Sequence, residues 1–146
     1  MKTELIYIVE DEKFFSNIAA QMLRSMGYNN AVQYYNGNDC KNNLYKNPDI
    51  IILDHLLGDQ NGIDILREIK STNPNIDVIF LSGQEELQVA VDSLKYGAFD
   101  YVTKDEACFD KLKASLEKLE RTRELIKGNE KKSNLAKRLI GKLGLY

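Results

Sequence analysis

The chain alternates between short runs of apolar residues and longer stretches in which apolar residues recur every three or four positions. Five runs rich in branched or aromatic side chains predict β-strands. These runs lie at residues 5–9, 31–35, 50–53, 78–81 and 101–103. The third run, Ile50-Ile51-Ile52-Leu53, has no polar alternation, which is typical of a central strand covered on both faces.

A stretch of helical periodicity follows each run. Apolar residues three or four positions apart predict helices near residues 14–26, 38–45, 63–69, 87–94 and 109–127. Gly27 and Gly97 stand where the first and fourth helices should end. Pro48 and Pro74 stand just beyond the second and third, where a helix cannot easily continue.

Strict alternation of strands and helices predicts an α/β fold with a parallel sheet and helices on both faces. Right-handed crossovers leave few topologies for five such units. We therefore expect a doubly wound (βα)5 flavodoxin-like sheet with the strand order 2-1-3-4-5. In such a sheet the functional crevice lies at the carboxyl ends of the strands, so the residues just after each apolar run are the candidates for a site.

Composition narrows the class of protein. A chain of 146 residues with 43% hydrophobic residues has room for one domain and its core. A net charge of −2 gives no general attraction to nucleic acid or to anionic membranes. No apolar run is long enough for a membrane span, and no signal peptide is evident. Cys40 and Cys108 lack metal-ligand spacing, so we expect two reduced thiols in a soluble cytoplasmic protein.

The last part of the chain differs in character. We predict one domain at residues 1–127, followed at residues 128–146 by a polar linker and a short basic amphipathic tail. This tail is too short for a DNA-binding domain, so we expect no direct nucleic-acid binding by this segment. It could be a docking element, an extension of the fifth helix or the start of an output domain, and the domain itself could stand alone or be excised from a longer protein.

Charged and polar residues follow four of the five strands. The first strand leads into Glu10-Asp11-Glu12, the third into Asp54, the fourth into Ser82-Gly83 and the fifth into Lys104. Clustered carboxylates need a cation or raised pKa values, and oxygen-rich ligation of this kind suits Mg²⁺. An ammonium and a hydroxyl beside them complete a pocket for a phosphoryl group on a carboxylate.

Each of these residues alone has a simpler explanation. The acidic triplet could be a solvated loop that caps the first helix, and Asp54 could be a turn residue. Ser82-Gly83 could be an ordinary helix entry and Lys104 a surface lysine. The combination is far more specific, because four separate strand ends must carry suitable chemistry in the right order.

These residues belong to longer matching stretches. Over residues 4–127 the chain resembles the CheY-like receiver domain of bacterial two-component response regulators. The stretches that carry the resemblance are Ile6-Tyr7-Ile8-Val9-Glu10-Asp11-Glu12, Asn36-Gly37, Ile51-Ile52-Leu53-Asp54, Asn61-Gly62, Val78-Ile79-Phe80-Leu81-Ser82-Gly83 and Gly97-Ala98-Phe99-Asp100-Tyr101-Val102-Thr103-Lys104.

The resemblance implies that Asp54 accepts a phosphoryl group from a sensor histidine kinase or a phosphotransfer protein. It implies that Glu10, Asp11, Asp54 and the backbone carbonyl of Leu56 hold Mg²⁺, with Asp11 as the direct ligand and Glu10 acting through water. Lys104 would be the lysine of the site. The protein would catalyse only its own phosphorylation and dephosphorylation, and would not be an enzyme for a separate substrate.

The resemblance also implies a switch. Ser82 would be the switch hydroxyl, Tyr101 the switch aromatic and Gly83 the small residue that leaves the phosphoryl group accessible. The output would be the face built from the fourth helix, the fifth strand and the fifth helix, which could also form a homodimer. No membrane partner is expected.

Three residues bear on the geometry of the predicted site. The family commonly has proline, often in a cis bond, directly after the lysine; here Asp105 follows Lys104, so we expect a trans bond and a negative charge that could compete for the lysine. The loop after Asp54 has Gly58 where proline is common, which makes it more flexible. His55 is expected to be a loop residue whose side chain points away from that of Asp54.

Three other classes of protein share parts of this pattern. A nucleotide or flavin binder would need a glycine-rich first loop, which Glu10-Asp11-Glu12-Lys13 is not. A hydrolase that forms an aspartyl phosphate usually has a second carboxylate two residues after the nucleophile, and here that position is Leu56. A pseudo-receiver that binds partners without phosphorylation remains open because of Asp105.

Overall fold

The structure is a computed structural model that describes residues 2–83 and 87–144. The chain forms two compact units, residues 1–113 and 114–146, and their boundary falls inside the last helix. The elements of the described residues are β1 (Lys2–Val9), α1 (Lys13–Ser25), β2 (Tyr28–Tyr34), α2 (Gly37–Asn42), the 3-10 helix η1 (Leu44–Lys46), β3 (Ile50–Asp54), β4 (Leu56–Leu57), β5 (Gln60–Asn61), α3 (Gly62–Thr72), β6 (Asp77–Ser82), α4 (Leu87–Lys95), β7 (Asp100–Thr103) and α5 (Cys108–Lys142).

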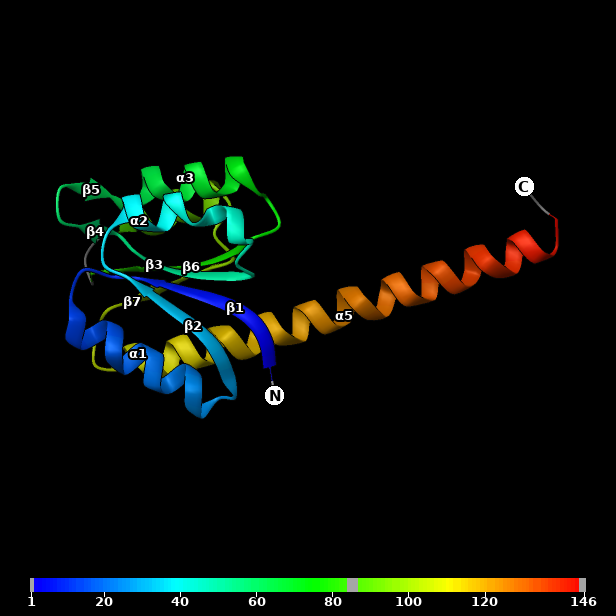
Figure 1. The fold of residues 1–146 in the computed structure, drawn as a ribbon, viewed down its shortest axis with the longest axis horizontal. Helices are drawn as coiled ribbons and strands as arrows, with labels where there is room; N and C mark the ends of the chain where they lie inside the picture. The colour runs from blue at the N-terminus through cyan, green and yellow to red at the C-terminus, as the bar shows by residue number, and fades with distance from the viewer. Residues whose placement is uncertain (1, 84–86, 145–146) are drawn as a thin grey trace. The chain divides into compact units, whose positions relative to one another are not determined.

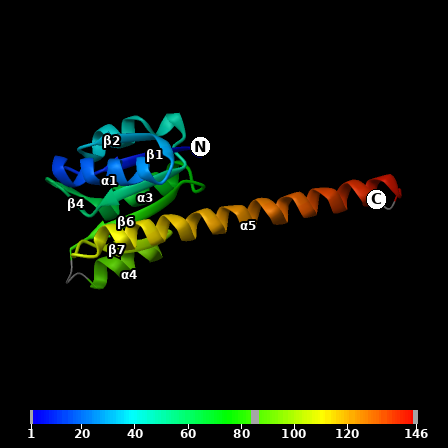
Figure 2. The same cartoon turned by 90° about the horizontal axis from the view of Figure 1, so that it is seen from below.

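The first unit contains a five-stranded parallel sheet in the order β2-β1-β3-β6-β7, which confirms the predicted order. Val9 lies opposite Leu53, and Leu53 lies opposite Phe80, so the central strands end nearly level. Figure 1 shows α2 and α3 on one face of the sheet and α1 on the other. Figure 2 shows α4 beside β7. The carboxyl ends of β1, β3, β6 and β7 therefore share one edge.

The core of the first unit lies on both sides of β3. Every residue of this strand is buried, as its lack of polar alternation predicted. One hydrophobic cluster joins alternate strand residues to α2 and α3, and its members include Tyr7, Val9, Cys40, Ile51, Leu53, Ile65, Leu66, Ile69, Val78 and Phe80. The alternation fixes which face each side chain occupies, and it does the same for the residues at the strand ends.

Helix α1 lies where its periodicity predicts, but its fully buried side chains are not those of the apolar row that carries this periodicity, Phe14, Ile18, Met22 and Met26. Its buried residues are Ser16, Ala19, Ala20 and Leu23, whereas Phe14 is 72% exposed. Gly27 has a φ of 93° just after the helix, as the predicted stop requires.

The apolar row that predicted α4 faces solvent. Leu87, Val91 and Leu94 are exposed, and the buried residue of this helix is Ser93. The helix was predicted correctly, yet these three side chains do not build the core. A row of large exposed apolar side chains on one helix face is typical of a contact surface.

Two features differ from the sequence prediction. Residues 56–61 form a short antiparallel hairpin, β4–β5, that was not predicted. Helix α5 continues to Lys142, so the predicted end near Lys127 is wrong, and of the alternatives left open for the tail the structure has the extension of the fifth helix. Gly128 and the polar residues after it do not stop the helix, because glycine in a helix costs only about 1 kcal/mol relative to alanine. Residues 145 and 146 of the predicted tail, and Met1 of the predicted domain, lie outside the described residues.

In the second unit, residues 114–142 are helical. Its exposed large apolar side chains are Leu125, Ile126, Leu135, Leu139, Ile140 and Leu143. No helix within residues 2–83 and 87–144 is both long and apolar enough to cross a membrane. Cys40 and Cys108 are buried free thiols, as predicted.

Candidate functional site

Three carboxylates meet at the carboxyl edge of the sheet. Glu10 follows β1 and Asp54 ends β3, and the pairing of these strands places the two residues side by side. Glu10 is 1% exposed and Asp54 is 5% exposed, while Asp11 is exposed. One ligand atom from each residue lies within 4.8 Å of the others. The structure thus brings together the three acidic residues that the sequence assigned to one edge.

Lys104 reaches this cluster from the loop after β7. Its Nζ lies 2.6 Å from Oε1 of Glu10 and 3.0 Å from Oδ1 of Asp54. It also lies 4.4 Å from the centre of the Phe15 ring. Burial disfavours the charged form, but the hydrogen bond to Glu10 and the charge of Asp54 outweigh it and raise the pKa of Lys104. Lys104 is therefore an ammonium held between two acids.

One ammonium does not neutralise the acidic cluster. Burial and the neighbouring Asp54 raise the pKa of Glu10 to about 8, although Lys104 acts in the opposite direction. Oε2 of Glu10 is buried and has no hydrogen-bond partner among the described residues. A divalent cation would satisfy this oxygen and relieve the repulsion, and Mg²⁺ prefers such ligands. Glu10, Asp11 and Asp54 therefore fit a magnesium ion.

The fourth predicted ligand comes from the hairpin. Leu56 lies in β4, two residues after Asp54, and pairs with Asn61. Its side chain is exposed. The binding of Mg²⁺ by the backbone carbonyl of Leu56 remains a prediction.

The predicted switch residues lie on the neighbouring strands. Ser82 ends β6 one position after Leu81, the partner of Asp54 in the sheet, and it is buried. Tyr101 lies in β7, is half-buried, and donates its hydroxyl to the carbonyl of Gly83 at 3.4 Å. A β-carbon added at Gly83 would meet no atom of the described residues within 4 Å. That Gly83 leaves the phosphoryl group accessible stays a prediction.

His55 has a contact that the sequence analysis missed. It is a loop residue, as predicted, but its side chain is buried and its Nδ1 lies 3.4 Å from Oγ of Ser82. Strand alternation could have indicated this contact. Residue 55 follows Leu53 by two positions, and Leu53 lies opposite Phe80 on the face that Ser82 shares.

Receiver domains commonly have proline at the position of Gly58. In this chain, polar contacts hold the loop after β3 instead. Gly58 has a φ of 66°, which a proline cannot adopt. Its N–H donates to Oδ2 of Asp11 at 3.2 Å. The glycine therefore shapes the turn and also joins it to the acidic cluster.

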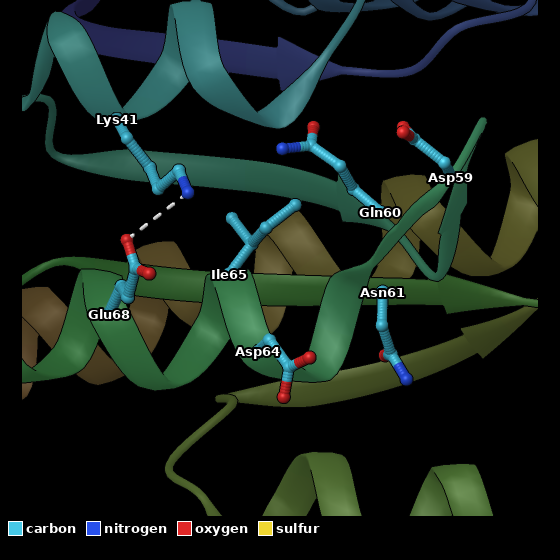
Figure 3. Close-up of a pocket in the computed structure, with 7 residues that line it drawn as sticks. All are labelled: Lys41, Asp59, Gln60, Asn61, Asp64, Ile65 and Glu68. Atoms are coloured by element: carbon cyan, nitrogen blue, oxygen red, sulfur yellow. Dashed lines mark ion pairs between the residues drawn. The ribbon is translucent and has the colours of Figure 1, made fainter.

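Gln60 fastens the same hairpin to α2. Its Oε1 accepts a hydrogen bond from the N–H of Gly37 at 2.7 Å, and its Nε2 donates to Asn38 at 3.0 Å. Figure 3 shows Gln60 near Ile65, and the ion pair of Lys41 with Glu68. The four residues Lys41, Gln60, Ile65 and Glu68 line a pocket together with Asp59, Asn61 and Asp64. This pocket contains none of the predicted site residues.

The loop after β7 is held by Asp105. All described peptide bonds are trans, as expected without the proline. Oδ2 of Asp105 accepts from Thr103 at 3.0 Å and pairs with Lys111, and Oδ1 accepts from the N–H of Ala107 at 2.9 Å. The hydrogen bond from Lys111 lowers the pKa of Asp105. The negative charge of Asp105 therefore pairs with Lys111, and Lys104 pairs with the acidic cluster.

The geometry of this edge agrees with the comparison with known proteins. The chain matches the response regulator receiver domain family over residues 6–117. It belongs to that family. The receiver domain resemblance and the flavodoxin-like fold are therefore confirmed. The family operates in two-component signal transduction, and phosphorylation and magnesium binding are general features of it.

Individual relatives support the same family. The transcriptional regulatory protein ZraR of Salmonella typhimurium is 36% identical over 121 residues, which are 82% of this chain and 27% of that protein. A receiver domain protein from Clostridium thermocellum is 26% identical with a TM-score of 0.75, covering 85% of this chain and 99% of that one. A BeF3-activated DrrB receiver domain is 28% identical with a TM-score of 0.68, and the match covers 80% of this chain and 99% of that one. This receiver domain spans about a quarter of the length of the ZraR proteins.

Proposed function

We propose that this receiver domain is a phosphorylation-activated switch of a two-component phosphorelay, with Asp54 as the phosphoacceptor. The supporting observation is the convergence of the Glu10, Asp11 and Asp54 carboxylates, with Lys104 at 3.0 Å from Asp54. Such an arrangement suits the transfer of a phosphoryl group to a carboxylate, because transfer depends mainly on positioning and charge neutralisation.

The donor is the phosphohistidine of a sensor histidine kinase or of a phosphotransfer protein. A carboxylate oxygen of Asp54 forms a bond to phosphorus while the bond from phosphorus to the donor nitrogen breaks, and the donor imidazole keeps that electron pair. Lys104 pairs with the negative charge of the phosphoryl oxygens. Glu10, Asp11, Asp54 and the carbonyl of Leu56 would hold Mg²⁺, which when bound supplies further positive charge there.

Phosphorylation changes the surface through Ser82 and Tyr101. Ser82 donates its hydroxyl proton to a phosphoryl oxygen, and Tyr101 leaves Gly83 and turns inward. The affected surface comprises α4, β7 and residues 108–113 of α5. The exposed Leu87, Val91 and Leu94 support this assignment, because a contact surface needs accessible apolar side chains. Its partner is a second copy of the chain or a downstream protein of the cytoplasm, and this segment makes no direct contact with nucleic acid.

The second candidate is a pseudo-receiver that binds its partners without phosphorylation. Asp105 and Gly58, which stand where the family commonly has proline, favour it. The direct contacts of Lys104 with Glu10 and Asp54 argue against it, since a receiver that is never phosphorylated has no need of this charge arrangement.

Titration with beryllofluoride in the presence of Mg²⁺ tests the proposal, because this phosphoryl mimic needs a free carboxylate. The wild type should bind it and Asp54→Asn should not. Equal binding by both variants, or binding by neither, would contradict the assignment of Asp54. Hydrolysis of generic phosphate esters at multiple turnovers would instead indicate a hydrolase, and phosphotransfer from a histidine kinase to Asp54→Asn would place the acceptor elsewhere.

A further inference from the structure

The imidazole of His55 lies against the predicted switch hydroxyl. Nδ1 of His55 is 3.4 Å from Oγ of Ser82. His55 is 9% exposed and Ser82 is 1% exposed, so protein surrounds both groups. Ser82 is the residue whose hydroxyl should turn to the phosphoryl group, and His55 directly follows the acceptor in the chain. The contact therefore joins the two parts of the switch.

The backbone holds His55 in this position. Its N–H donates to the carbonyl of Leu81 at 2.8 Å, and its carbonyl accepts from the N–H of Gly62 at 2.7 Å. A β-carbon at Gly62 would lie 2.8 Å from Cα of His55 and would collide with the carbonyl oxygen of Asp54. The imidazole also lies beside the ring of Phe80, with 6.0 Å between the ring centres. The position of the imidazole is therefore set by the end of β3 and not by a mobile loop.

The hydroxyl of Ser82 has one proton to donate. If this proton points to Nδ1 of His55, it cannot also point to a phosphoryl oxygen. At 3.4 Å the contact is at the long end of hydrogen bonds. A hydrogen bond to a charged phosphoryl oxygen is shorter and stronger. The exchange of one acceptor for the other is therefore favourable once Asp54 is phosphorylated.

We propose that His55 is a positioning residue that accepts the Ser82 hydroxyl in the unphosphorylated protein, and that Ser82 leaves it on activation. This inference rests on the proposed function, in which Asp54 is the phosphoacceptor. It assigns to His55 the stabilisation of the inactive arrangement. His55 touches neither the donor nor the transferred group in this scheme, so it acts on the reaction only through Ser82.

Two variants of residue 55 separate this role from packing. His55→Phe keeps an aromatic ring but has no acceptor. His55→Asn places a polar atom close to the position of Nδ1 and should restore the contact. Each is made with Ser82 intact and with Ser82→Ala. Thermal unfolding checks that every variant folds, and beryllofluoride is titrated in the presence of Mg²⁺.

With Ser82 intact, His55→Phe should tighten beryllofluoride binding about 2- to 10-fold, the range of a single neutral hydrogen bond. His55→Asn should bind like the wild type. With Ser82→Ala, His55→Phe should have no effect. Unchanged binding, weaker binding, or a tightening that persists with Ser82→Ala would each overturn the proposal.

A nitrogen-15 NMR measurement on the imidazole of His55 gives a readout that does not depend on the folding of the residue 55 variants. The Nδ1 resonance should shift toward that of a nitrogen without a hydrogen bond when beryllofluoride binds, and should not shift in Ser82→Ala. An Nδ1 resonance that is the same before and after binding would exclude the exchange. If the wild type does not bind beryllofluoride, or binds it no better than Asp54→Asn, the proposed function fails; failure of the His55 effects alone leaves that function standing.

Discussion

The two loops beside Asp54 both lack a proline that is common in the family, yet they contribute different donors to the acidic cluster. The loop after β3 contributes a neutral N–H, from Gly58 to Asp11 at 3.2 Å. The loop after β7 contributes an ammonium, from Lys104 to Glu10 at 2.6 Å and to Asp54 at 3.0 Å. The exposed Asp11 thus contacts a backbone dipole, whereas the buried Glu10 and Asp54 contact a full positive charge. This difference agrees with the cost of burying a charge, which an exposed acid does not incur.

The loops also differ in what holds them. The conformation of the first depends on glycines, since Gly58 has a positive φ and Gly62 lies against the backbone of residues 54 and 55. The second depends on side chains, since Asp105 binds Thr103, Lys111 and the N–H of Ala107. Backbone substitutions should therefore perturb the first loop, and changes of charge or pH should perturb the second.

We expect the largest effect from Gly62→Ala. The new β-carbon would lie 2.8 Å from Cα of His55 and collide with the Asp54 carbonyl, so the end of β3 must shift. We expect the free energy of unfolding to fall by about 1–3 kcal/mol, as in other overpacked sites. Beryllofluoride binding should weaken with it. Denaturant titration measures the free energy of unfolding, and calorimetry measures beryllofluoride binding.

Gly83→Ala is the matched control for that change, because a β-carbon there meets no atom within 4 Å in the part of the chain that the structure describes. It should alter the free energy of unfolding by less than about 0.5 kcal/mol. Equal losses in the two variants would mean that the close approach at Gly62 is not what shapes the first loop.

The pH dependence of stability and of Mg²⁺ affinity should come from Glu10, the buried acid that Lys104 contacts. The pKa of Glu10 is raised from 4.5 to about 8 by burial and by Asp54, so the folded protein favours the protonated form. The contribution of Glu10 to the stability of the metal-free protein is then greatest below pH 4.5 and is lost as the pH rises through about 8. Mg²⁺ needs the carboxylate, so its affinity should rise up to about tenfold per pH unit below that pKa.

Unfolding in EDTA and Mg²⁺ titration at a series of pH values check this prediction. Glu10→Gln should flatten the dependence of both quantities on pH. Glu12→Gln, which changes an exposed neighbour, should leave both as in the wild type. A slope that survives in Glu10→Gln would assign the proton to another group.

Most of the sheet could be predicted from the sequence because its strands are short apolar runs separated by helices. The same reasoning failed where the signal was weaker. The two-residue strands β4 and β5 are too short to show a period, and polar residues after Gly128 suggested a linker although glutamate and lysine also suit a helix. The exposed row on α4 shows a further limit, since periodicity identifies an apolar face but not whether that face meets the core or a partner.

At the site, the sequence predicted which residues converge but not how they pair. Parallel strands bring Glu10, Asp54 and Lys104 to one edge once the strand order is known. The pairing of Asp105 with Lys111 joins the loop before α5 to the helix, and helical periodicity does not specify such a contact although it predicted the start of α5 to within one residue. The His55 contact depends on the register of β3 against β6 beyond the last apolar residue.

Gly58→Ala should have a smaller effect than Gly62→Ala. No atom obstructs a β-carbon at this position, but a φ of 66° is unfavourable for alanine. The expected loss is about 1–2 kcal/mol in the free energy of unfolding. Gly58→Asn should lose less, because asparagine tolerates this conformation. If alanine and asparagine cost the same, the turn has rearranged and the comparison of the loops needs revision. Denaturant titration of the three proteins measures these differences.

Removing the charge of Asp105 should give the smallest effect. It should also show whether the loop after β7 depends on the charge of Asp105 or on its hydrogen bond from the N–H of Ala107. Asp105→Asn keeps an acceptor for the N–H of Ala107 but loses the pair with Lys111, whereas Asp105→Ala loses both. We expect beryllofluoride binding to weaken about two- to fivefold in Asp105→Ala, because Lys104 is then less well placed, and less in Asp105→Asn. Added salt should weaken binding by the wild type and reduce its advantage over Asp105→Asn, since an exposed ion pair is screened. Asp110→Ala, which removes an acidic side chain in the first turn of α5, should bind like the wild type. If Asp105→Ala also binds like the wild type at low salt, Lys104 holds its position through the acidic cluster alone, and the loop after β7 follows the cluster instead of positioning it.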